Sequence, residues 1–287
     1  MLIRASGITD VGLKREANED CFTTDDTLGL YVVADGMGGH LAGEVASSVA
    51  VELIKKSFAK WTESDASEEA VFGLPDQALS RRGNYVLGSI RLANRVIHEM
   101  ALHYDKYHGM GTTVAILAVF QGLVISANVG DSRIYMLRNG HLERLSKDHT
   151  IVAEQVEMGI MDPKDAETSP LKHVLTKNLG SSETVNAEIF EFEPASGDRF
   201  LLCSDGLTDL MADEEILQMI QEEDSPDILC RNFVDEALKR GGHDNTTVIS
   251  ILLSGIEASS YGPLKRLGIF LADSLTGVHK ISRKLKP

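Results

Sequence analysis

The sequence of 287 residues has few cysteines and no cysteine pair. Cys21, Cys203 and Cys230 are widely spaced, and no two of them form a Cys-x-x-Cys motif. Isolated cysteines in odd number argue against a disulfide framework and indicate no zinc cluster. A reducing compartment is the simplest explanation. Because the N-terminus also lacks a basic segment followed by an apolar one, the sequence predicts a cytoplasmic protein.

Long apolar runs and an excess of basic residues are also missing. No run approaches the roughly 18 apolar residues that a membrane span needs. The chain has 28 Lys and Arg against 43 Asp and Glu, a formal net charge of −15. This balance argues against nucleic acid or anionic lipid as the main partner. With 43% hydrophobic residues, the chain can bury a full core in one large domain or two small ones.

The sequence does contain a glycine-rich turn after an apolar run. Residues 30–34 predict a β-strand that leads into Asp35 and the turn 36–39, Gly-Met-Gly-Gly, and a helical pattern follows at 43–61. Glycines allow backbone angles and close approaches that a Cβ would prevent. A carboxylate beside bare carbonyls suits a hard cation, although a β-turn that happens to contain Asp explains the stretch equally well.

Other acidic residues repeat this arrangement. Asp131, Asp205 and Asp244 each lie at the end or the start of a strand-like run, and the neighbours Glu19 and Asp20 directly precede one. Adjacent carboxylates point to opposite sides of an extended chain, so one of that pair can bind a metal directly and the other through a water. Taken singly, each feature also has a simpler explanation. Glu19 and Asp20 can belong to a solvated charged loop, and Asp131 can form an ion pair with Arg133 on a hairpin.

Taken together, the acidic residues point to one shared site, because five independent coincidences are harder to explain. Oxygen ligands without cysteine or paired histidine favour magnesium or manganese over zinc. Carboxylates gathered at one point repel one another, and bound cations supply the compensating charge. Two cations about 3.5–4 Å apart can hold a bridging hydroxide and polarise a phosphoryl oxygen.

The remaining patterns predict short antiparallel strands and a few helices. Two dipeptides, Gln121-Gly122 and Asn139-Gly140, are hairpin signals. Residues 151–176 predict a helix followed by an irregular flap. Further elements are expected as strands at 3–9, 21–24, 112–120, 123–129, 133–137, 185–192, 198–203 and 246–253, and as helices at 86–103, from 213 onward and at 226–239.

Six motifs occur in a specific order along the chain. They are Arg15 with 18–20 (Asn-Glu-Asp), 34–40 (Ala-Asp-Gly-Met-Gly-Gly-His), 109–113 (Gly-Met-Gly-Thr-Thr), 128–133 (Asn-Val-Gly-Asp-Ser-Arg), 204–206 (Ser-Asp-Gly) and 242–245 (Gly-His-Asp-Asn). The ordered set resembles the metal-dependent serine/threonine protein phosphatases of the protein phosphatase 2C family, in their compact bacterial form. The resemblance covers about residues 3–253.

This resemblance implies an α+β fold for a phosphatase domain at 1–254. The expected architecture is an α-β-β-α sandwich of two antiparallel sheets flanked by antiparallel helices, with a metal cleft between the sheets. Asp35 would bridge two metal ions, and the Gly36 carbonyl and Glu19 would complete the site of the second ion. Asp205 and Asp244 would hold the first ion.

Four further roles follow from the same resemblance. Asp20 would orient a metal-bound water, and Asp131 together with Asp205 would bind a weaker third ion. Arg15 would clamp the substrate phosphate with its planar fork of donors. His40 is the candidate general acid for the leaving group, although a metal-bound water can serve equally.

The implied reaction is hydrolysis of phosphoserine and phosphothreonine in proteins by a metal-bridging hydroxide, without a phospho-enzyme. Its cofactors would be Mn²⁺ or Mg²⁺, two core ions and a weaker third. The expected partners are phosphorylated substrates of a cognate Ser/Thr kinase, and the expected state is a monomer. The chain departs from the family pattern at Met37, where many eukaryotic relatives have His, and in the flap, where 175–180 read Leu-Thr-Lys-Asn-Leu-Gly instead of Leu-Thr-Arg-Ala-Leu-Gly. Because the flap sequence affects substrate choice, the substrate specificity of the family is not assigned to this chain.

The last part of the chain, 255–287, differs in charge from the rest. Six basic residues against two acidic ones leave it at +4, and the preceding residues at −19. This basic amphipathic tail is expected either to dock on the acidic body, on a partner or on a membrane surface, or to be a loosely ordered terminus, which is the simplest of these alternatives.

Two rival functions belong to other classes. A non-catalytic module on the same fold would lack some of the metal carboxylates, and none is missing. A hydrolase of small phosphoesters, or a phosphatase dedicated to one anti-sigma-type switch protein, remains compatible with the sequence.

Overall fold

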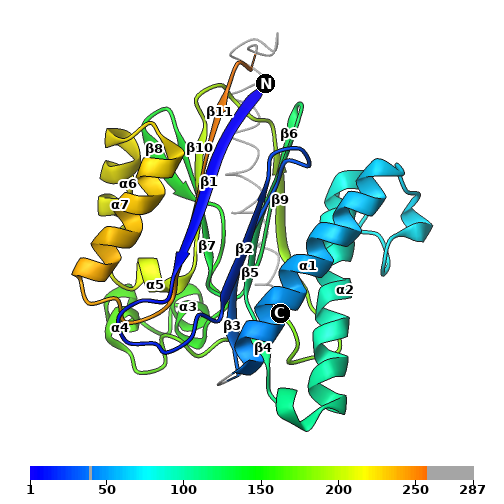
Figure 1. The fold of residues 1–287 in the computed structure, drawn as a ribbon, viewed down its shortest axis with the longest axis horizontal. Coiled ribbons are helices and arrows are strands. Elements are labelled where there is room, and N and C mark those ends of the chain that lie inside the picture. The colour runs from blue at the N-terminus through cyan, green and yellow to red at the C-terminus, as the bar shows by residue number, and fades with distance from the viewer. Residues whose placement is uncertain (39–40, 257–287) are drawn as a thin grey trace, which may run out of the picture.

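The computed structural model describes residues 1–38 and 41–256, with the side chain of Leu41 excepted. Two antiparallel sheets lie face to face, and a pair of long helices covers the outer face of each (Figure 1). The predicted α-β-β-α sandwich is therefore confirmed. His40 and the tail residues 257–287 lie outside the described residues, so the predictions made for them stay predictions.

The first sheet contains the N-terminal strand and the last strand as direct neighbours. Residue Leu2 pairs with Ser254, and Asp10 pairs with Thr246. The strand order across the sheet is β1 (Leu2–Asp10), β11 (Thr246–Ser254), β10 (Arg199–Cys203), β7 (Arg133–Arg138) and β8 (His141–Arg144).

The second sheet is built around the apolar run of β5, whose seven residues are all buried. A strand covered by a sheet on one face and helices on the other has no solvent side, so its sequence does not alternate. The order is β2 (Asp20–Asp25), β3 (Leu30–Met37), β5 (Val114–Phe120), β6 (Leu123–Val129) and β9 (Glu188–Phe192), and β4 (Gly111–Thr112) also pairs with β3.

Helices α1 (Leu41–Glu63) and α2 (Arg81–His103) run in opposite directions over the second sheet, and α6 (Asp213–Glu222) and α7 (Pro226–Lys239) cover the first (Figure 1). No helix in the described ranges is long and apolar enough to span a membrane. Short helices complete the chain: η1 (Glu68–Ala70), η2 (Asp105–Tyr107), α3 (Ile151–Glu157), α4 (Pro163–Thr168) and α5 (Asp205–Thr208).

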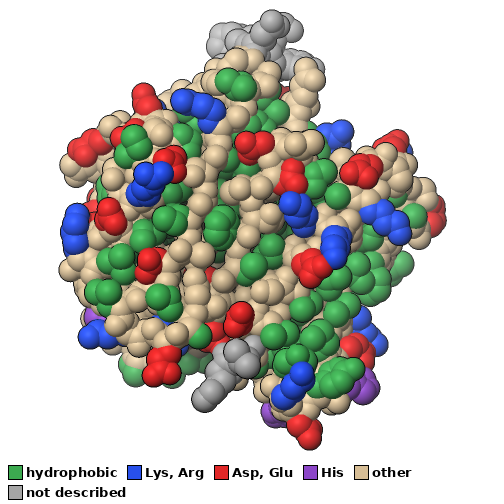
Figure 2. All heavy atoms as spheres, in the orientation of Figure 1, with side chains coloured by type: hydrophobic (Ala, Val, Ile, Leu, Met, Phe, Trp, Pro, Cys, Tyr) green, Lys and Arg blue, Asp and Glu red, His purple; other side chains and the backbone are tan. Residues whose placement is uncertain are grey.

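Three apolar clusters hold these layers together. One lies between the two sheets, and each of the others lies between a sheet and its helices. The outer faces of the helices carry interspersed acidic and basic side chains on the face shown in Figure 2. Both sheets and the helices that cover them therefore contribute to three adjoining cores.

One local prediction was wrong. Residues 35–37 continue strand β3 and do not form a turn, because Gly36 and Met37 pair with β4. The alternative of a hairpin at Asp131 and Arg133 is also excluded, because β6 and β7 belong to different sheets and residues 130–132 cross from one sheet to the other. Strand β8 was not predicted, and β9 begins at Glu188, three residues later than expected.

Substituting Phe233 tests the packing of α7 on the first sheet. The side chain is fully buried, so Phe233→Ala removes its contacts and leaves a cavity, and we expect it to lower the free energy of unfolding by about 3–5 kcal/mol. Ile228 lies on the same helix but is 46% exposed, so Ile228→Ala is expected to change the free energy of unfolding by about 0.5 kcal/mol or less. Urea unfolding of both variants provides the comparison. Equal losses would contradict this arrangement of α7.

Candidate metal centre

The predicted acidic residues meet at one end of the two sheets. Asp20 and Asp35 are register partners on the neighbouring strands β2 and β3. Asp205 is the first residue of α5, two residues after the end of β10, and Asp244 lies two residues before β11, the strand beside β10. These four residues are far apart in the sequence, but their strands end on the same side of the two sheets (Figure 1). Their carboxylates therefore lie together.

Asp35 lies at the centre of this group. Burial raises the pKa of Asp35 well above its ordinary value, and the negative charges of four other carboxylates raise it further. The backbone of Asp35 is fixed by Thr113, whose hydroxyl accepts from the Asp35 N–H at 3.0 Å and whose N–H donates to the Asp35 carbonyl at 2.8 Å. The four carboxylates, in order of effect, are those of Asp20, Asp205, Asp131 and Asp244.

The two carboxylate oxygens of Asp20 differ in their hydrogen bonding. Its Oδ2 accepts hydrogen bonds from Ser204 Oγ at 2.8 Å and Thr247 Oγ1 at 2.7 Å, whereas Oδ1 is buried and has no partner among the described residues. Burial is the main cause that raises the pKa of Asp20 to about 7. A buried carboxylate oxygen without a donor is costly, so it is a natural position for a cation or an ordered water.

Glu19 shows the same pattern. Its Oε1 is buried without a hydrogen-bond partner in the described part of the chain, and burial raises the pKa of the side chain. The backbone around it is fixed, because Asn245 Oδ1 accepts from the Glu19 N–H at 2.8 Å and the Gly36 N–H donates to the Glu19 carbonyl at 3.1 Å. A Cβ on Gly43 would lie 2.5 Å from Oε1, and one on Gly36 would lie 2.1 Å from the Gly43 carbonyl oxygen. Both glycines are therefore required by close approach.

A third group joins Asp131, Asp205 and His173. One ligand atom from each of these side chains lies within 4.8 Å of the other two. Burial and the charge of Asp205 raise the pKa of Asp131 to about 7, and the interaction with Asp205 raises the pKa of His173. His173 belongs to the segment 170–180, which we call the flap, and it also lies 3.2 Å from Asp209.

Arg15 reaches the same site from the β1–β2 connection. Its Nη2 donates to Asp244 Oδ2 at 2.6 Å, and half of the side chain is exposed. Its charge also lowers the pKa of Glu19, although burial outweighs this effect. In this arrangement Arg15 neutralises part of the carboxylate group and remains accessible from solvent.

The alternative ion pair between Asp131 and Arg133 is not present. Arg133 instead binds Asp148, with Nη2 at 2.8 Å from Oδ2 and Nε at 3.1 Å from Oδ1. Arg133 Nη1 also lies 3.2 Å from the Tyr135 hydroxyl, whereas one carboxylate oxygen of Asp131 lies within 4.8 Å of one from Asp205.

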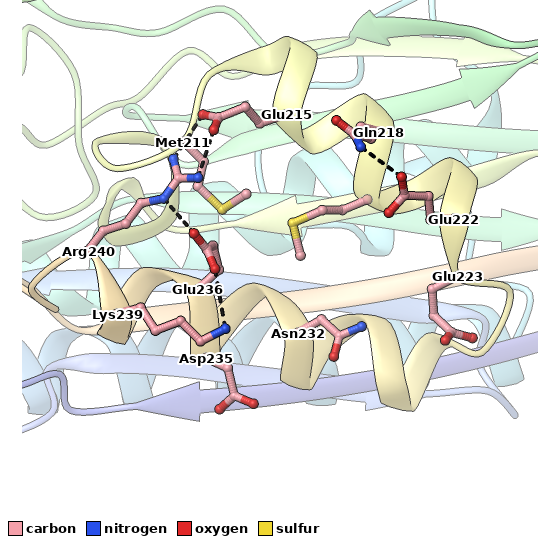
Figure 3. A pocket seen from close by; sticks show the side chains of 11 residues that line it. Met211, Glu215, Gln218, Glu222, Glu223, Asn232, Asp235, Glu236, Lys239 and Arg240 are labelled. Atoms are coloured by element: carbon pink, nitrogen blue, oxygen red, sulfur yellow. Dashed lines mark hydrogen bonds and ion pairs between the residues drawn. The ribbon is translucent and has the colours of Figure 1, made fainter.

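A groove of about 520 Å³ lies elsewhere, between α6 and α7 (Figure 3). Arg240 crosses it and pairs with Glu215 at 2.7 Å and with Glu236 at 2.9 Å. None of the clustered carboxylates lines this groove. The pair with Glu215 joins the two helices at an exposed surface, which is typical of a structural contact.

Comparison with known proteins agrees with this geometry. The family model described as Protein phosphatase 2C matches residues 14–240. The chain belongs to the protein phosphatase 2C family.

Bacterial relatives indicate which activity within this family the chain has. The serine/threonine phosphatase stp of Listeria monocytogenes serovar 1/2a is 35% identical over 246 residues, which cover 85% of this chain and 93% of the relative. The solved serine/threonine phosphatase PstP/Ppp of Mycobacterium tuberculosis has a TM-score of 0.76 and 31% identity, covering 89% of this chain and 100% of that one. The catalytic domain of PstP in complex with two manganese ions has a TM-score of 0.74 and 31% identity, covering 88% and 99%. This chain is therefore a metal-dependent protein-serine/threonine phosphatase, and its substrates are phosphoproteins.

The residues of this phosphatase fit hard cations. The converging side chains offer oxygen atoms and one imidazole, and two of the buried oxygens, Glu19 Oε1 and Asp20 Oδ1, have no hydrogen-bond partner within residues 1–38 and 41–256. Such a donor set matches Mg²⁺ and Mn²⁺ better than zinc or soft metals. The repulsion among the carboxylates is also what bound cations would remove.

Sequence reasoning missed several residues of this phosphatase. His173 lies alone in an irregular segment, and no spacing signal marks it. Thr113 and Ser204 belong to the recognised motifs, but their roles as hydrogen-bond partners of Asp35 and Asp20 depend on strand pairing that the sequence does not specify. His40 cannot be compared, because it lies outside the described residues.

The pH dependence of stability tests this clustering in chelated protein. The folded protein retains protons on Asp20 and Asp131 up to about pH 7, whereas the unfolded chain releases them near about pH 4. The folded state therefore binds more protons in this interval, and the stability of the metal-free protein should fall as pH rises from about 4 to about 7. Thermal unfolding across this range measures the effect.

Two controls accompany this experiment. Asp20→Asn should reduce the fall, because the amide does not ionise. An excess of Mn²⁺ should raise the melting temperature at pH 7, by about 2.7 kcal/mol of added stability when the free ion reaches about 100 times its dissociation constant. A metal-free protein that becomes more stable from pH 4 to pH 7 would contradict the clustering.

Proposed function

We propose that the metal centre binds two core ions of Mn²⁺ or Mg²⁺ and a weaker third ion. The observation that carries this proposal is a pair of buried oxygens, Glu19 Oε1 and Asp20 Oδ1, that have no hydrogen-bond partner in the part of the chain that the structure describes. They lie beside Asp35, whose pKa is raised by burial and by four other carboxylates. Asp35 would be shared by the two core ions, the Gly36 carbonyl and Glu19 would complete the site of one, and Asp205 with Asp244 would complete the site of the other. This assignment is supported by the convergence of these residues at one end of the sheets.

The third ion is assigned to Asp131 and Asp205. Their nearest oxygens lie within 4.8 Å of each other and of a His173 nitrogen, so His173 is a further candidate ligand. This site shares Asp205 with a core ion, so Asp131 is the one carboxylate in it that no core ion uses. A weaker affinity for this ion follows.

The residues of the site have different roles in the proposed hydrolysis. When bound, the ions supply the hydroxide nucleophile and positive charge for the phosphoryl oxygens. Arg15 leaves Asp244 and binds the substrate phosphate with two parallel N–H donors. Asp20 orients the attacking water through Oδ1, since Ser204 and Thr247 hold its Oδ2 in place. The proton for the leaving alkoxide is assigned to His40 or to a water.

We also propose the substrates, the oligomeric state, the location and the domain boundaries of the enzyme. We expect substrates of a cognate Ser/Thr kinase, a monomeric and cytoplasmic enzyme, and a catalytic domain at 1–254 followed by the tail 255–287. Membrane contact through the tail is the less favoured alternative. Liposome binding at low salt that disappears on truncation after Ser254 would support it.

Add-back of metal to chelated protein tests the proposed function. Mn²⁺ or Mg²⁺ should restore hydrolysis of a phosphoserine or phosphothreonine peptide, with much lower turnover of sugar phosphates. Asp35→Asn and Asp205→Asn should abolish turnover, because each removes a charge from the core ions while preserving side-chain shape. Circular dichroism and thermal unfolding check that both variants fold. Full activity in both variants would refute the site assignment, and faster turnover of sugar phosphates would refute the substrate class.

The role of Arg15 is tested separately. Arg15→Ala should lower kcat/KM for a phosphopeptide by about 10- to 100-fold, the range expected when a hydrogen bond to a charged group worth about 1.5–3 kcal/mol is lost. Arg15→Lys should recover only part of this loss, because an ammonium cannot form the bidentate contact. The neighbouring Lys14 is exposed and makes no contact with the carboxylates among the described residues, so Lys14→Ala serves as the control and should retain normal kcat/KM. Equal losses in the Arg15 and Lys14 variants would argue for general electrostatic attraction.

A further inference from the structure

His149 is a buried histidine outside the set of metal residues. Its side chain is 2% exposed, and its ring lies against the crossover that carries Asp131. The Gly130 N–H donates to His149 Nδ1 at 3.0 Å, and the His149 N–H donates to the Gly130 carbonyl at 3.0 Å. Two hydrogen bonds therefore fix the residue that directly precedes Asp131.

Gly130 cannot adjust easily when this contact changes. Its φ is +103°, and an added Cβ would lie 2.6 Å from Thr113 Cγ2. Thr113 also binds the backbone of Asp35 and shares a 2.7 Å hydrogen bond with Ser132 Oγ. The turn is thus held between Thr113 on one side and His149 on the other, and the direction of the Asp131 side chain depends on both contacts.

The ring of His149 is restricted to one tautomer. Because Nδ1 accepts from Gly130, the ring proton lies on Nε2. Nε2 is buried, has no hydrogen-bond partner in the described residues and lies 3.8 Å from Glu188 Oε1. The pKa of Glu188 is lowered, chiefly by His149 and also by Lys177, so a charged carboxylate faces the Nε2–H.

The same residues also hold the flap. The Thr176 N–H donates to the His149 carbonyl at 2.8 Å, and the Ile151 N–H donates to the Val174 carbonyl at 2.9 Å. Lys177 Nζ lies 3.8 Å from Glu188 Oε1, so this carboxylate faces both His149 and the flap. His173, which approaches Asp205, immediately precedes the residues anchored in this way.

Repulsion makes such an anchor necessary. One carboxylate oxygen of Asp131 lies within 4.8 Å of one from Asp205, so the two carboxylates repel each other and tend to separate when no cation lies between them. An exposed turn would relax by moving Asp131 away. A buried ring with two hydrogen bonds to the preceding residue resists that movement and keeps the ligand oxygens together.

We propose that His149 is a positioning residue that holds the Asp131 turn ready for the third metal ion and links this turn to the flap through Glu188. The proposal rests on the proposed third ion and adds two separable roles for one ring. The Nδ1 edge fixes the metal side, and the Nε2 edge fixes the flap side.

Two matched substitutions separate these edges. In His149→Asn the amide oxygen takes the place of Nδ1 and can still accept from Gly130, but nothing reaches Glu188. In His149→Gln the amide reaches the place of Nε2 and keeps an N–H directed toward Glu188, but the acceptor for Gly130 is lost. Both substitutions are polar and of similar size, so a general loss of packing would affect them alike.

Calorimetric titration with Mn²⁺ and amide hydrogen exchange provide the two measurements. His149→Gln should weaken the third ion about 10-fold or more, whereas His149→Asn should stay within about 3-fold of the wild type, and the core ions should bind normally in both. His149→Asn should speed exchange of the flap amides at 174–177 more than His149→Gln does. Thermal unfolding confirms that both variants are folded, and Asp131→Asn marks the loss of the third ion.

Each result has one interpretation. Equal effects of the two variants on both measurements, or normal third-ion affinity in His149→Gln, would overturn the proposal. A wild-type protein that binds only two ions would overturn the third ion itself and, with it, this role of His149. Absence of phosphopeptide hydrolysis by the wild type would instead refute the proposed function, and it is measured independently.

Discussion

The mutual repulsion of buried carboxylates is the constraint on which the rest of this structure depends. Asp35 lies among four other acidic side chains, and burial removes the water that would screen them. Such a group is unfavourable in the metal-free protein and becomes favourable when cations lie between its members. The carboxylates thus lower the stability of the metal-free protein at one end of the fold and form a site for divalent ions, as is common in active sites.

The sandwich makes this unfavourable arrangement possible. Asp35 is part of a strand that is paired on both sides, and Asp20 lies opposite it on β2. Ser204, Thr113 and Asn245 hold neighbouring backbone and carboxylate atoms by hydrogen bonds from well-packed strand ends. Three apolar cores stabilise the framework, so the acidic end cannot relax without breaking strand pairing. Rigid support of this kind is what keeps metal ligands at usable distances.

Much of this could be predicted from the sequence. Alternation and apolar runs indicate most strands and helices, and the order of the glycine–aspartate motifs indicates the family. The strand at Asp35 and Gly36 was missed because its glycines suggest a turn, whereas pairing with β4 decides the outcome. The sequence left a hairpin at 130–132 open as an alternative, because local residues do not specify which sheet the next strand joins. His173 and His149 lack any local signal, since their contacts are formed only in three dimensions.

The central claim is that these carboxylates gather around divalent cations, and anomalous diffraction from a crystal grown with excess Mn²⁺ tests it most directly. The account predicts two manganese peaks about 3.5–4 Å apart that share the Asp35 carboxylate, one beside Glu19 and the other beside Asp205 and Asp244. Manganese bound only at scattered surface acids, with none in contact with Asp35, would contradict it.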